Sequence, residues 1–123
     1  YMTKNYFFDS YAIYELIIGN KDYENYIDAN IVITKLNIFE VFYILMRDGN
    51  KELANNFITS WINFVVDFEE DVIKEAAMLR LINKKYNLSM TDCIGYIIAK
   101  KLSIKFLTGD RQFENMDNVE FVK

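Results

Sequence analysis

Short apolar runs alternate with stretches of helical periodicity along the whole chain, and few folds are compatible with this alternation. Runs typical of buried strands cover residues 6–9, 31–34, 104–107 and 119–122, and the segment 63–66 is a candidate for one more short strand. Strands separated by helices predict a parallel sheet that is covered on both faces. We therefore expect an α/β fold with three layers, α/β/α, around a central parallel sheet.

Five helices are predicted from apolar spacing and from capping and stop signals. They cover residues 10–18, 36–46, 51–61, about 67–85 and 89–101, and a short helical or irregular piece covers 21–29. Asp67 and Glu70 occupy capping-box positions of the fourth helix, and Ser89 or Thr91 would begin the fifth. No linker or internal repeat divides the chain, so residues 1–123 are expected to form one domain.

Composition narrows the class of protein. A single cysteine, Cys93, leaves no intrachain disulfide and no cysteine-based zinc cluster, which fits a reducing interior. The longest apolar or glycine run, residues 93–99, is far too short for a membrane span. No signal peptide is evident near the N-terminus. We expect a cytoplasmic protein without membrane association.

The net charge of −4 and the pI near 4.8 argue against a protein that coats DNA, because such proteins are basic. They do not exclude a nuclease that gathers carboxylates to hold metal. Basic residues concentrate late in the chain. Lys100, Lys101, Lys105 and Arg111 are candidate phosphate contacts, and Arg111 alone is placed beside a possible site by the sequence.

Three aspartates stand at the ends of predicted elements. Asp9 closes the first strand, Asp110 follows the strand 104–107 in the stretch FLTGDRQF, and Asp92 opens a late helix. Each has a purely structural explanation, as a helix cap, a turn residue or a first-turn acid. In open parallel α/β folds, however, ligands bind outside the carboxyl ends of the strands, which is where Asp9 and Asp110 lie.

Glu40 is harder to explain structurally, because it lies in LNIFEVFYIL, a helix that is apolar nearly all round. Such a helix is normally buried. A buried carboxylate is usually paired, protonated or bound to metal, because burying the bare charge costs several kcal/mol. Either an ion pair with a Lys or Arg, or a cation shared with Asp9, Asp92 and Asp110, would satisfy Glu40.

The chain contains no histidine, which removes many kinds of site at once. Histidine-based zinc sites, Ser-His-Asp triads and ribonuclease chemistry with paired histidines are all excluded. The phosphate-binding motifs GxxxxGK[ST] and GxGxxG are also missing. FDSYA has one acid where a phosphatase of the haloacid dehalogenase type, or a receiver domain, would have a pair. Oxygen-only carboxylate ligands suit Mg²⁺ or Mn²⁺.

The ordered set FFDSYAIYELI, TKLNIFEVFYIL, LSMTDCIGYIIAKKL and IKFLTGDRQF resembles the PIN domain, most closely the small stand-alone kind of VapC toxins and archaeal relatives. The resemblance covers residues 6–122. It implies a parallel sheet in the order 3-2-1-4-5. It also implies that Asp9, Glu40, Asp92 and Asp110 are the metal ligands and catalytic acids, with Ser10 and Thr108 as supporting hydroxyls.

Family members are Mg²⁺- or Mn²⁺-dependent ribonucleases, so the resemblance implies hydrolysis of RNA phosphodiesters by a water activated at one or two metal ions. Clustered carboxylates repel one another, and without metal at least one should have a raised pKa. Activity should then fall as the pH drops. VapC-like toxins usually form homodimers, and an antitoxin segment covers their active cleft.

Three functions therefore remain open. The first is a ribonuclease toxin of a toxin–antitoxin pair, and the second is a housekeeping RNA-processing nuclease that acts without an antitoxin. The third is a non-catalytic interaction domain that keeps the acids for stability. Four like charges in one cleft would be destabilising without metal, which argues against the third.

Overall fold

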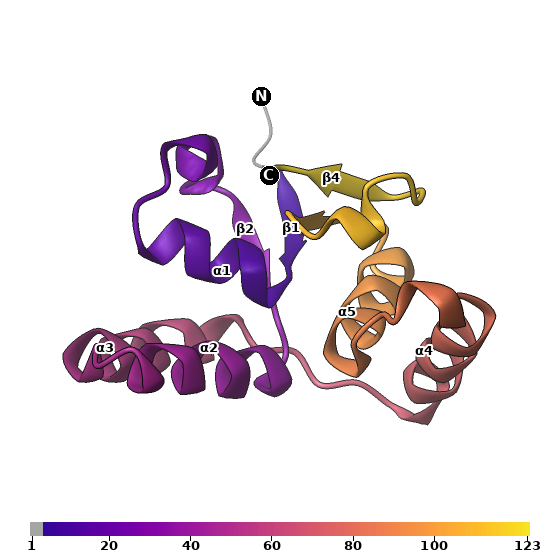
Figure 1. The fold of residues 1–123 in the computed structure, drawn as a ribbon, viewed down its shortest axis with the longest axis horizontal. Helices are drawn as coiled ribbons and strands as arrows, with labels where there is room; N and C mark the ends of the chain where they lie inside the picture. Colours follow the sequence, from indigo (N-terminus) through magenta and orange to yellow (C-terminus); the bar gives the residue numbers. More distant parts are fainter. Residues whose placement is uncertain (1–3) are drawn as a thin grey trace.

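Four parallel strands form the central layer of the computed structural model, which describes residues 4–123 (Figure 1). The strands are β1 (Asn5–Phe8), β2 (Asn30–Val32), β3 (Lys105–Thr108) and β4 (Val119–Phe121), in the order β2-β1-β3-β4. In the register of the sheet, Phe7 pairs with Val32 on one side and with Phe106 on the other. The predicted central parallel sheet is confirmed.

The candidate third strand at residues 63–66 is reduced to a single bridge, between Val65 and Ile33. Residues 62–64 continue directly out of the preceding helix as a 3₁₀ turn, so too little of the segment becomes extended for a ladder. Val66 donates its N–H to the carbonyl of Ile33 over 2.8 Å and fixes the segment beside β2. The predicted order 3-2-1-4-5 is therefore present as the segment 63–66, β2, β1, β3 and β4. The first of these is reduced to a single bridge.

The helices agree closely with the predicted segments. They are α1 (Ser10–Ile17), α2 (Lys35–Arg47), α3 (Lys51–Trp61), α4 (Glu70–Ile82) and α5 (Met90–Lys101), with 3₁₀ turns η1 (Lys21–Tyr26), η2 (Ile62–Phe64), η3 (Lys84–Tyr86) and η4 (Arg111–Phe113). The expected capping box at Asp67 and Glu70 is wrong, because Glu69 is the N-cap of α4 and makes no side-chain cap bond. Ser89 caps α5, as one of the two alternatives predicted.

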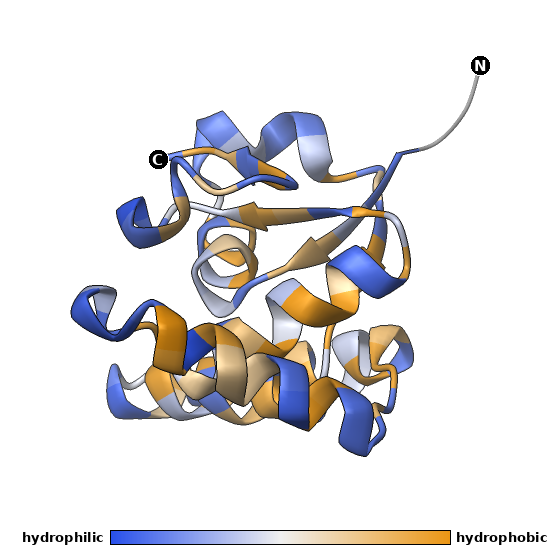
Figure 2. Cartoon of the chain, turned by 90° about the vertical axis from the view of Figure 1, so that its right-hand side faces the viewer, coloured by the Kyte–Doolittle hydropathy of each residue, from blue (hydrophilic) through white to orange (hydrophobic). Residues whose placement is uncertain are grey.

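Side chains of β1 divide the core into two halves. Tyr6 and Phe8 pack in a cluster with residues of α1, α2 and α3, whereas Phe7 packs with residues of α4 and α5. Gly95 lets α5 approach the sheet, because a Cβ at this position would lie 2.5 Å from the Phe7 ring. Hydrophobic residues follow the strands, and hydrophilic residues gather at the turns between elements (Figure 2). The three-layer arrangement is confirmed.

Cys93 is buried in the half of the core formed by α4 and α5, as expected for a small core residue. Within residues 4–123, no helix is long and apolar enough to cross a membrane.

Candidate functional site

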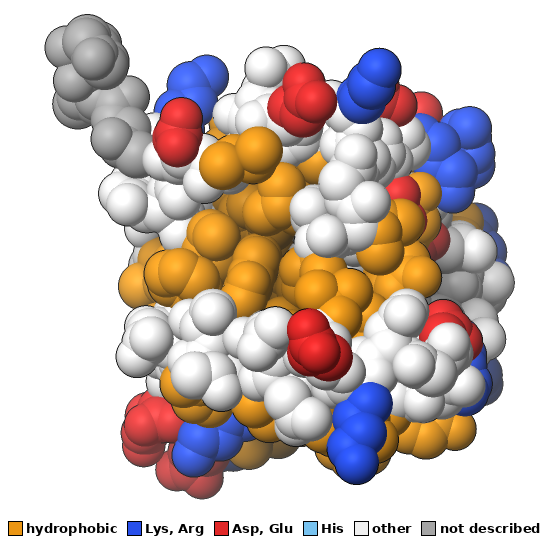
Figure 3. Space-filling model, turned by 90° about the vertical axis from the view of Figure 1, so that its left-hand side faces the viewer, with side chains coloured by type: hydrophobic (Ala, Val, Ile, Leu, Met, Phe, Trp, Pro, Cys, Tyr) orange, Lys and Arg blue, Asp and Glu red, His pale blue; other side chains and the backbone are white. Residues whose placement is uncertain are grey.

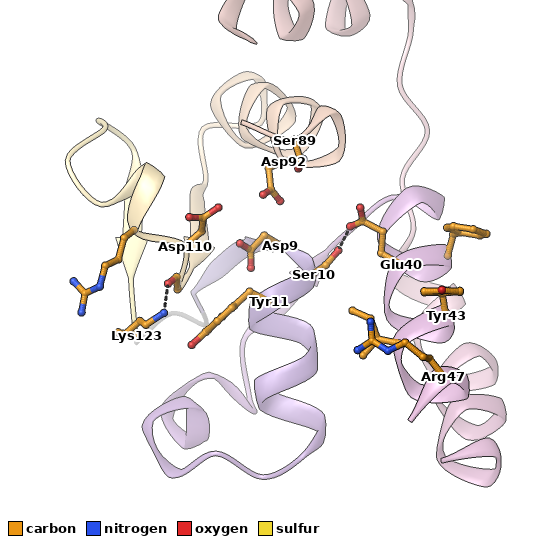
Figure 4. A pocket seen from close by; sticks show the side chains of 14 residues that line it. Asp9, Ser10, Tyr11, Glu40, Tyr43, Arg47, Ser89, Asp92, Asp110 and Lys123 are labelled. Carbon is orange, nitrogen blue, oxygen red and sulfur yellow. Dashed lines mark hydrogen bonds between the residues drawn. The ribbon is translucent and has the colours of Figure 1, made fainter. Parts of the chain in front are cut away.

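The four acids singled out by the sequence line one cleft of about 620 Å³ at the carboxyl ends of β1 and β3 (Figure 4). Asp9 follows β1, Asp110 lies beyond β3, Asp92 is in the first turn of α5, and Glu40 is in α2. Because β1 and β3 are neighbouring parallel strands, their ends meet, and the N–H of Asp9 donates to the carbonyl of Leu107 over 3.1 Å. The topology brings together acids that are far apart in sequence.

Asp9 is the most deeply placed of the four, with 1% of its surface exposed. Its Oδ1 accepts a hydrogen bond of 2.7 Å from the N–H of Ala12 and so caps α1. The Thr108 hydroxyl donates to its Oδ2. The structural explanation of Asp9 as a helix cap is therefore correct, and the same bonds fix its carboxylate at the floor of the cleft.

Thr108 connects the two acids that follow neighbouring strands. Besides donating to Asp9, its Oγ1 accepts a 3.0 Å hydrogen bond from the backbone N–H of Asp110. Asp110 in turn accepts from the N–H of Gln112 over 2.9 Å and caps η4. Thr108 thus lies where a supporting hydroxyl is expected and holds the loop of Asp110 against Asp9.

Glu40 is oriented by a chain of polar side chains from α1 and α2. Ser10 donates its hydroxyl to Oε1 of Glu40 over 2.6 Å, and the amide of Asn37 donates to Ser10 over 3.1 Å. Asn37 is held by the N–H and the hydroxyl of Thr34, which donate to its Oδ1. Asn37 and Thr34 are buried, and the sequence analysis missed both; the signal was a polar residue inside an apolar helix, three positions before Glu40.

The expectation that α2 is buried on all sides is wrong. Ile38, Val41 and Leu45 face the core, but Phe39 is 71% exposed and Tyr43 is 56% exposed. Glu40 is consequently half-buried at the edge of the cleft. The helix is apolar beyond what its packing against the sheet requires.

Burial and mutual repulsion change the acidity of two of the acids. Burial raises the pKa of Asp9 well above its ordinary range, and the charges of Asp92 and Asp110 raise it further, against hydrogen bonds from Thr108 and Ala12 that lower it. Burial likewise raises the pKa of Asp92 to about 7, with Ser89 lowering it and Glu40 and Asp110 raising it. The predicted electrostatic conflict within the cluster is present.

None of the four acids forms an ion pair with another residue of the described chain, 4–123. The ion pair that could have satisfied Glu40 is therefore not formed among these residues. Carboxylate oxygens without a basic partner are the ligands that Mg²⁺ and Mn²⁺ prefer. The donor set fits a divalent cation.

The acids face a common space without forming a closed coordination shell. Across residues 4–123, no three His, Cys, Asp or Glu side chains are grouped tightly enough to hold a metal ion as they are arranged. Metal binding would therefore have to draw the carboxylates closer together. Asp92 and Asp110 are half-buried, so their side chains have more freedom to move than that of Asp9.

Three of the four candidate phosphate contacts lie away from the cleft. Lys100 and Lys101 are in the last turn of α5, where each is paired with acidic side chains, whereas Asp92 begins the same helix at the cleft. Lys105 begins β3, at the end of the sheet opposite the cleft. These three expectations are wrong, because charge clustering in sequence does not indicate which end of an element a residue occupies.

Arg111 does line the cleft, where it forms a 3.3 Å ion pair with Glu114. Two further cations, Arg47 and Lys123, line it as well and were missed by the sequence analysis. Lys123 lies 5.1 Å from the centre of the Tyr11 ring, which closes one side of the cleft. Lys123 follows β4 closely, so the strand-end argument used for Asp9 and Asp110 could have found it. The position of Arg47 depends on how α2 packs, which no local pattern predicts.

Comparison with known proteins agrees with this arrangement. The family model described as the PIN domain matches residues 6–119, a range that contains all four acids. The chain belongs to the PIN-domain family. PIN domains are nucleases and generally use divalent metal ions. No curated protein matches the sequence of this PIN domain.

Solved structures share the fold of this PIN domain at low sequence identity. A toxin–antitoxin complex from Klebsiella pneumoniae has a TM-score of 0.73 at 17% identity, covering 93% of this chain and 94% of that chain. VapBC2 from Rickettsia felis, bound to a DNA fragment from its promoter, has a TM-score of 0.70 at 16% identity, covering 96% and 97%. PAE2754 from Pyrobaculum aerophilum has a TM-score of 0.66 at 17% identity, covering 98% and 92%.

Proposed function

We propose that this PIN domain is an endoribonuclease that depends on Mg²⁺ or Mn²⁺, and that Asp9, Glu40, Asp92 and Asp110 hold the metal. The observation that carries the proposal is the meeting of four carboxylates in one cleft without a basic partner among the described residues. Burying these charges beside one another is costly, as the raised pKa values of Asp9 and Asp92 indicate, and a divalent cation would offset that cost.

Each residue of the cleft then has a defined task. Asp9 supplies a rigid carboxylate, because Thr108 and the N–H of Ala12 fix both of its oxygens. Ser10 directs Glu40 toward the cleft. A bound metal ion would polarise the phosphodiester and make water a better nucleophile near neutral pH. Arg111, at the edge of the cleft, is a candidate contact for the substrate phosphate.

We further propose that the chain is the toxin of a toxin–antitoxin pair. Two of the similar structures are described as a toxin–antitoxin complex and as VapBC2. The face that carries α1, α2 and α3 has a hollow in which hydrophobic side chains gather (Figure 3). An apolar antitoxin segment would bury this surface, and a basic side chain from it would neutralise the acids.

A homodimer is proposed on a separate surface. Four large apolar side chains of α4 are exposed, namely Ile73, Met78, Leu81 and Ile82. An apolar groove of about 490 Å³ lies between α4 and α5 beside them. Apolar area of this kind on a small protein is typical of an interface with another copy or another protein.

Metal dependence is the first prediction. Purified, partner-free protein should cut RNA from a mixed panel with Mg²⁺ or Mn²⁺ and should not cut it in EDTA, because the acids alone offer no positive charge to the phosphate. Mn²⁺ should also raise the melting temperature by relieving the repulsion among the acids. The cut RNA is read by gel electrophoresis and the melting temperature by differential scanning fluorimetry. Cutting that persists in EDTA, or the absence of both effects, would contradict the proposed metal site.

Loss of the Ser10 hydroxyl is expected to weaken the site without unfolding the protein. Ser10→Ala removes the bond that orients Glu40, and groups that orient metal ligands typically contribute about 10- to 100-fold in metal affinity or activity. A titration of RNA cleavage against Mn²⁺ concentration measures the change. Ser60→Ala, an exposed serine in α3, is the matched control and should behave as the parent. Equal metal dependence for both variants would remove Ser10 from the site.

A further inference from the structure

Two exposed aromatic rings stack on one another at the edge of the cleft. Of the aromatic residues in the described part of the chain, Phe39, Tyr43 and Tyr86 are exposed, and the first two are one turn apart on α2. Their ring centres are 6.4 Å apart and their planes differ by 12°, so the two faces are nearly parallel. Both rings line the same cleft as the four acids.

The position of this ring pair relative to Glu40 is fixed by the helix. Phe39 precedes Glu40 directly and Tyr43 follows it by three residues, so both rings lie on one side of a proposed metal ligand. The core side of α2 is already occupied by Ile38, Val41 and Leu45. The rings contribute little to folding, because water covers most of their surface. Both rings are open to a substrate that enters the cleft beside Glu40.

Positive charge lies on both sides of the acids. Arg47 extends from α2, one turn beyond Tyr43, while Lys123 approaches from the opposite side (Figure 4). Arg111, which directly follows Asp110, lines the same cleft. The Nζ of Lys123 donates a long hydrogen bond of 3.5 Å to the Gly109 carbonyl. Cations on both sides and flat apolar rings on one side match a chain of phosphates that carries planar bases.

We propose that Phe39 and Tyr43 form a stacking platform for one unpaired base next to the cut phosphodiester, and that this contact positions the RNA chain in the cleft. The inference rests on the proposed ribonuclease function. In a duplex both faces of every base are covered by its neighbours, and no face is free for the rings. A single strand can turn one base onto the platform while Arg47, Arg111 and Lys123 contact the phosphates.

Binding of RNA to a protein variant that cannot cut it tests the platform separately from catalysis. The probe is a mixed-sequence single-stranded RNA of about 12 nucleotides, within the usual length of such sites. Its affinity is measured by fluorescence anisotropy with Asp9→Asn protein, in which cutting is blocked. Adding Tyr43→Ala should weaken binding roughly 5- to 150-fold, the range observed for loss of base stacking. Tyr43→Phe keeps the ring and should stay within about threefold of Asp9→Asn alone.

An abasic nucleotide moved along the RNA provides the decisive comparison. At one position it should weaken binding to the Asp9→Asn protein as much as Tyr43→Ala does. At that position the abasic nucleotide should not weaken binding further when the protein carries both Asp9→Asn and Tyr43→Ala, because the ring and the base form one contact. Tyr86→Ala, which removes an exposed tyrosine that does not line the cleft, should have no effect.

The proposal would be overturned if Tyr43→Ala bound single-stranded RNA as tightly as its background, or if duplex RNA of the same sequence bound equally well. The rings would then serve a protein partner instead. Failure of the ribonuclease function would look different, because the protein with Asp9 intact would not cut RNA in Mn²⁺ whatever residue occupied position 43. The variants at position 43 should melt at the same temperature as Asp9→Asn alone, which shows that a loss of binding is not a loss of folding.

Discussion

Asp9→Asn is expected to abolish RNA cleavage while making the protein more stable in EDTA. The carboxylate is proposed to contribute charge that holds the metal, and removing a metal site of this kind costs several kcal/mol of transition-state stabilisation, or on the order of 10³-fold in rate. The same charge is buried and repelled by Asp92, so its removal relieves a cost in the folded state. We expect a gain of about 1–3 kcal/mol in the free energy of unfolding.

The asparagine can keep the local geometry, because its Oδ1 still accepts from the N–H of Ala12 and its amide can donate to Thr108. Cleavage rates and urea unfolding in EDTA measure the two effects. Asp28→Asn changes the net charge equally at an exposed position and should change neither property. A stable variant that cuts at the parental rate would rule out Asp9 as a ligand. A variant that is less stable in EDTA would show that Asp9 serves the fold as a cap more than it serves a site.

Strand ends were the most informative part of the sequence. FFD and FLTGD each join a buried apolar run to a carboxylate, and parallel topology then brings Asp9 and Asp110 to the same edge of the sheet. That step needed only the alternation of strands and helices. The helix at 51–61 was equally predictable, because the Gly49-Asn50 signal before it is local.

The features that the sequence did not predict depend on distant contacts. LNIFEVFYIL has apolar residues on every side, so composition alone could not show that Phe39 and Tyr43 face water while Leu45 faces the core. The segment 63–66 has the composition of a strand, yet it leaves α3 too abruptly to pair along its length. The capping-box bonds between Thr34 and Asn37 are local, but the bond from Asn37 to Ser10 joins two helices and could not be predicted. Tertiary packing decides these cases, and local propensity does not.

The dependence of stability on pH should invert when metal is added. The pKa of Asp92 in the folded protein is about 7, above the ordinary value of 3.8, so the folded state binds its proton more tightly than the unfolded chain does. In EDTA the contribution of Asp92 is therefore most favourable below about pH 4 and is lost as the pH rises toward 7. At 1.36 kcal/mol per pH unit this interval corresponds to at most about 4 kcal/mol, and to about 2 kcal/mol after allowance for the exposed part of the side chain.

Subtracting the Asp92→Asn variant isolates this contribution from that of other carboxylates. Urea unfolding in EDTA should give the two proteins similar stability near pH 4, and the variant should be the more stable one at pH 8. With saturating Mn²⁺ the parent should instead gain stability as the pH rises, because the metal competes with the proton for the same oxygens. Cleavage at limiting Mn²⁺ should fall in parallel as the pH drops below 7. A parent and variant whose difference stays constant from pH 4 to pH 8 would mean that Asp92 ionises like an exposed acid. Burial and repulsion at Asp92 would then be too weak to favour metal binding in the cleft.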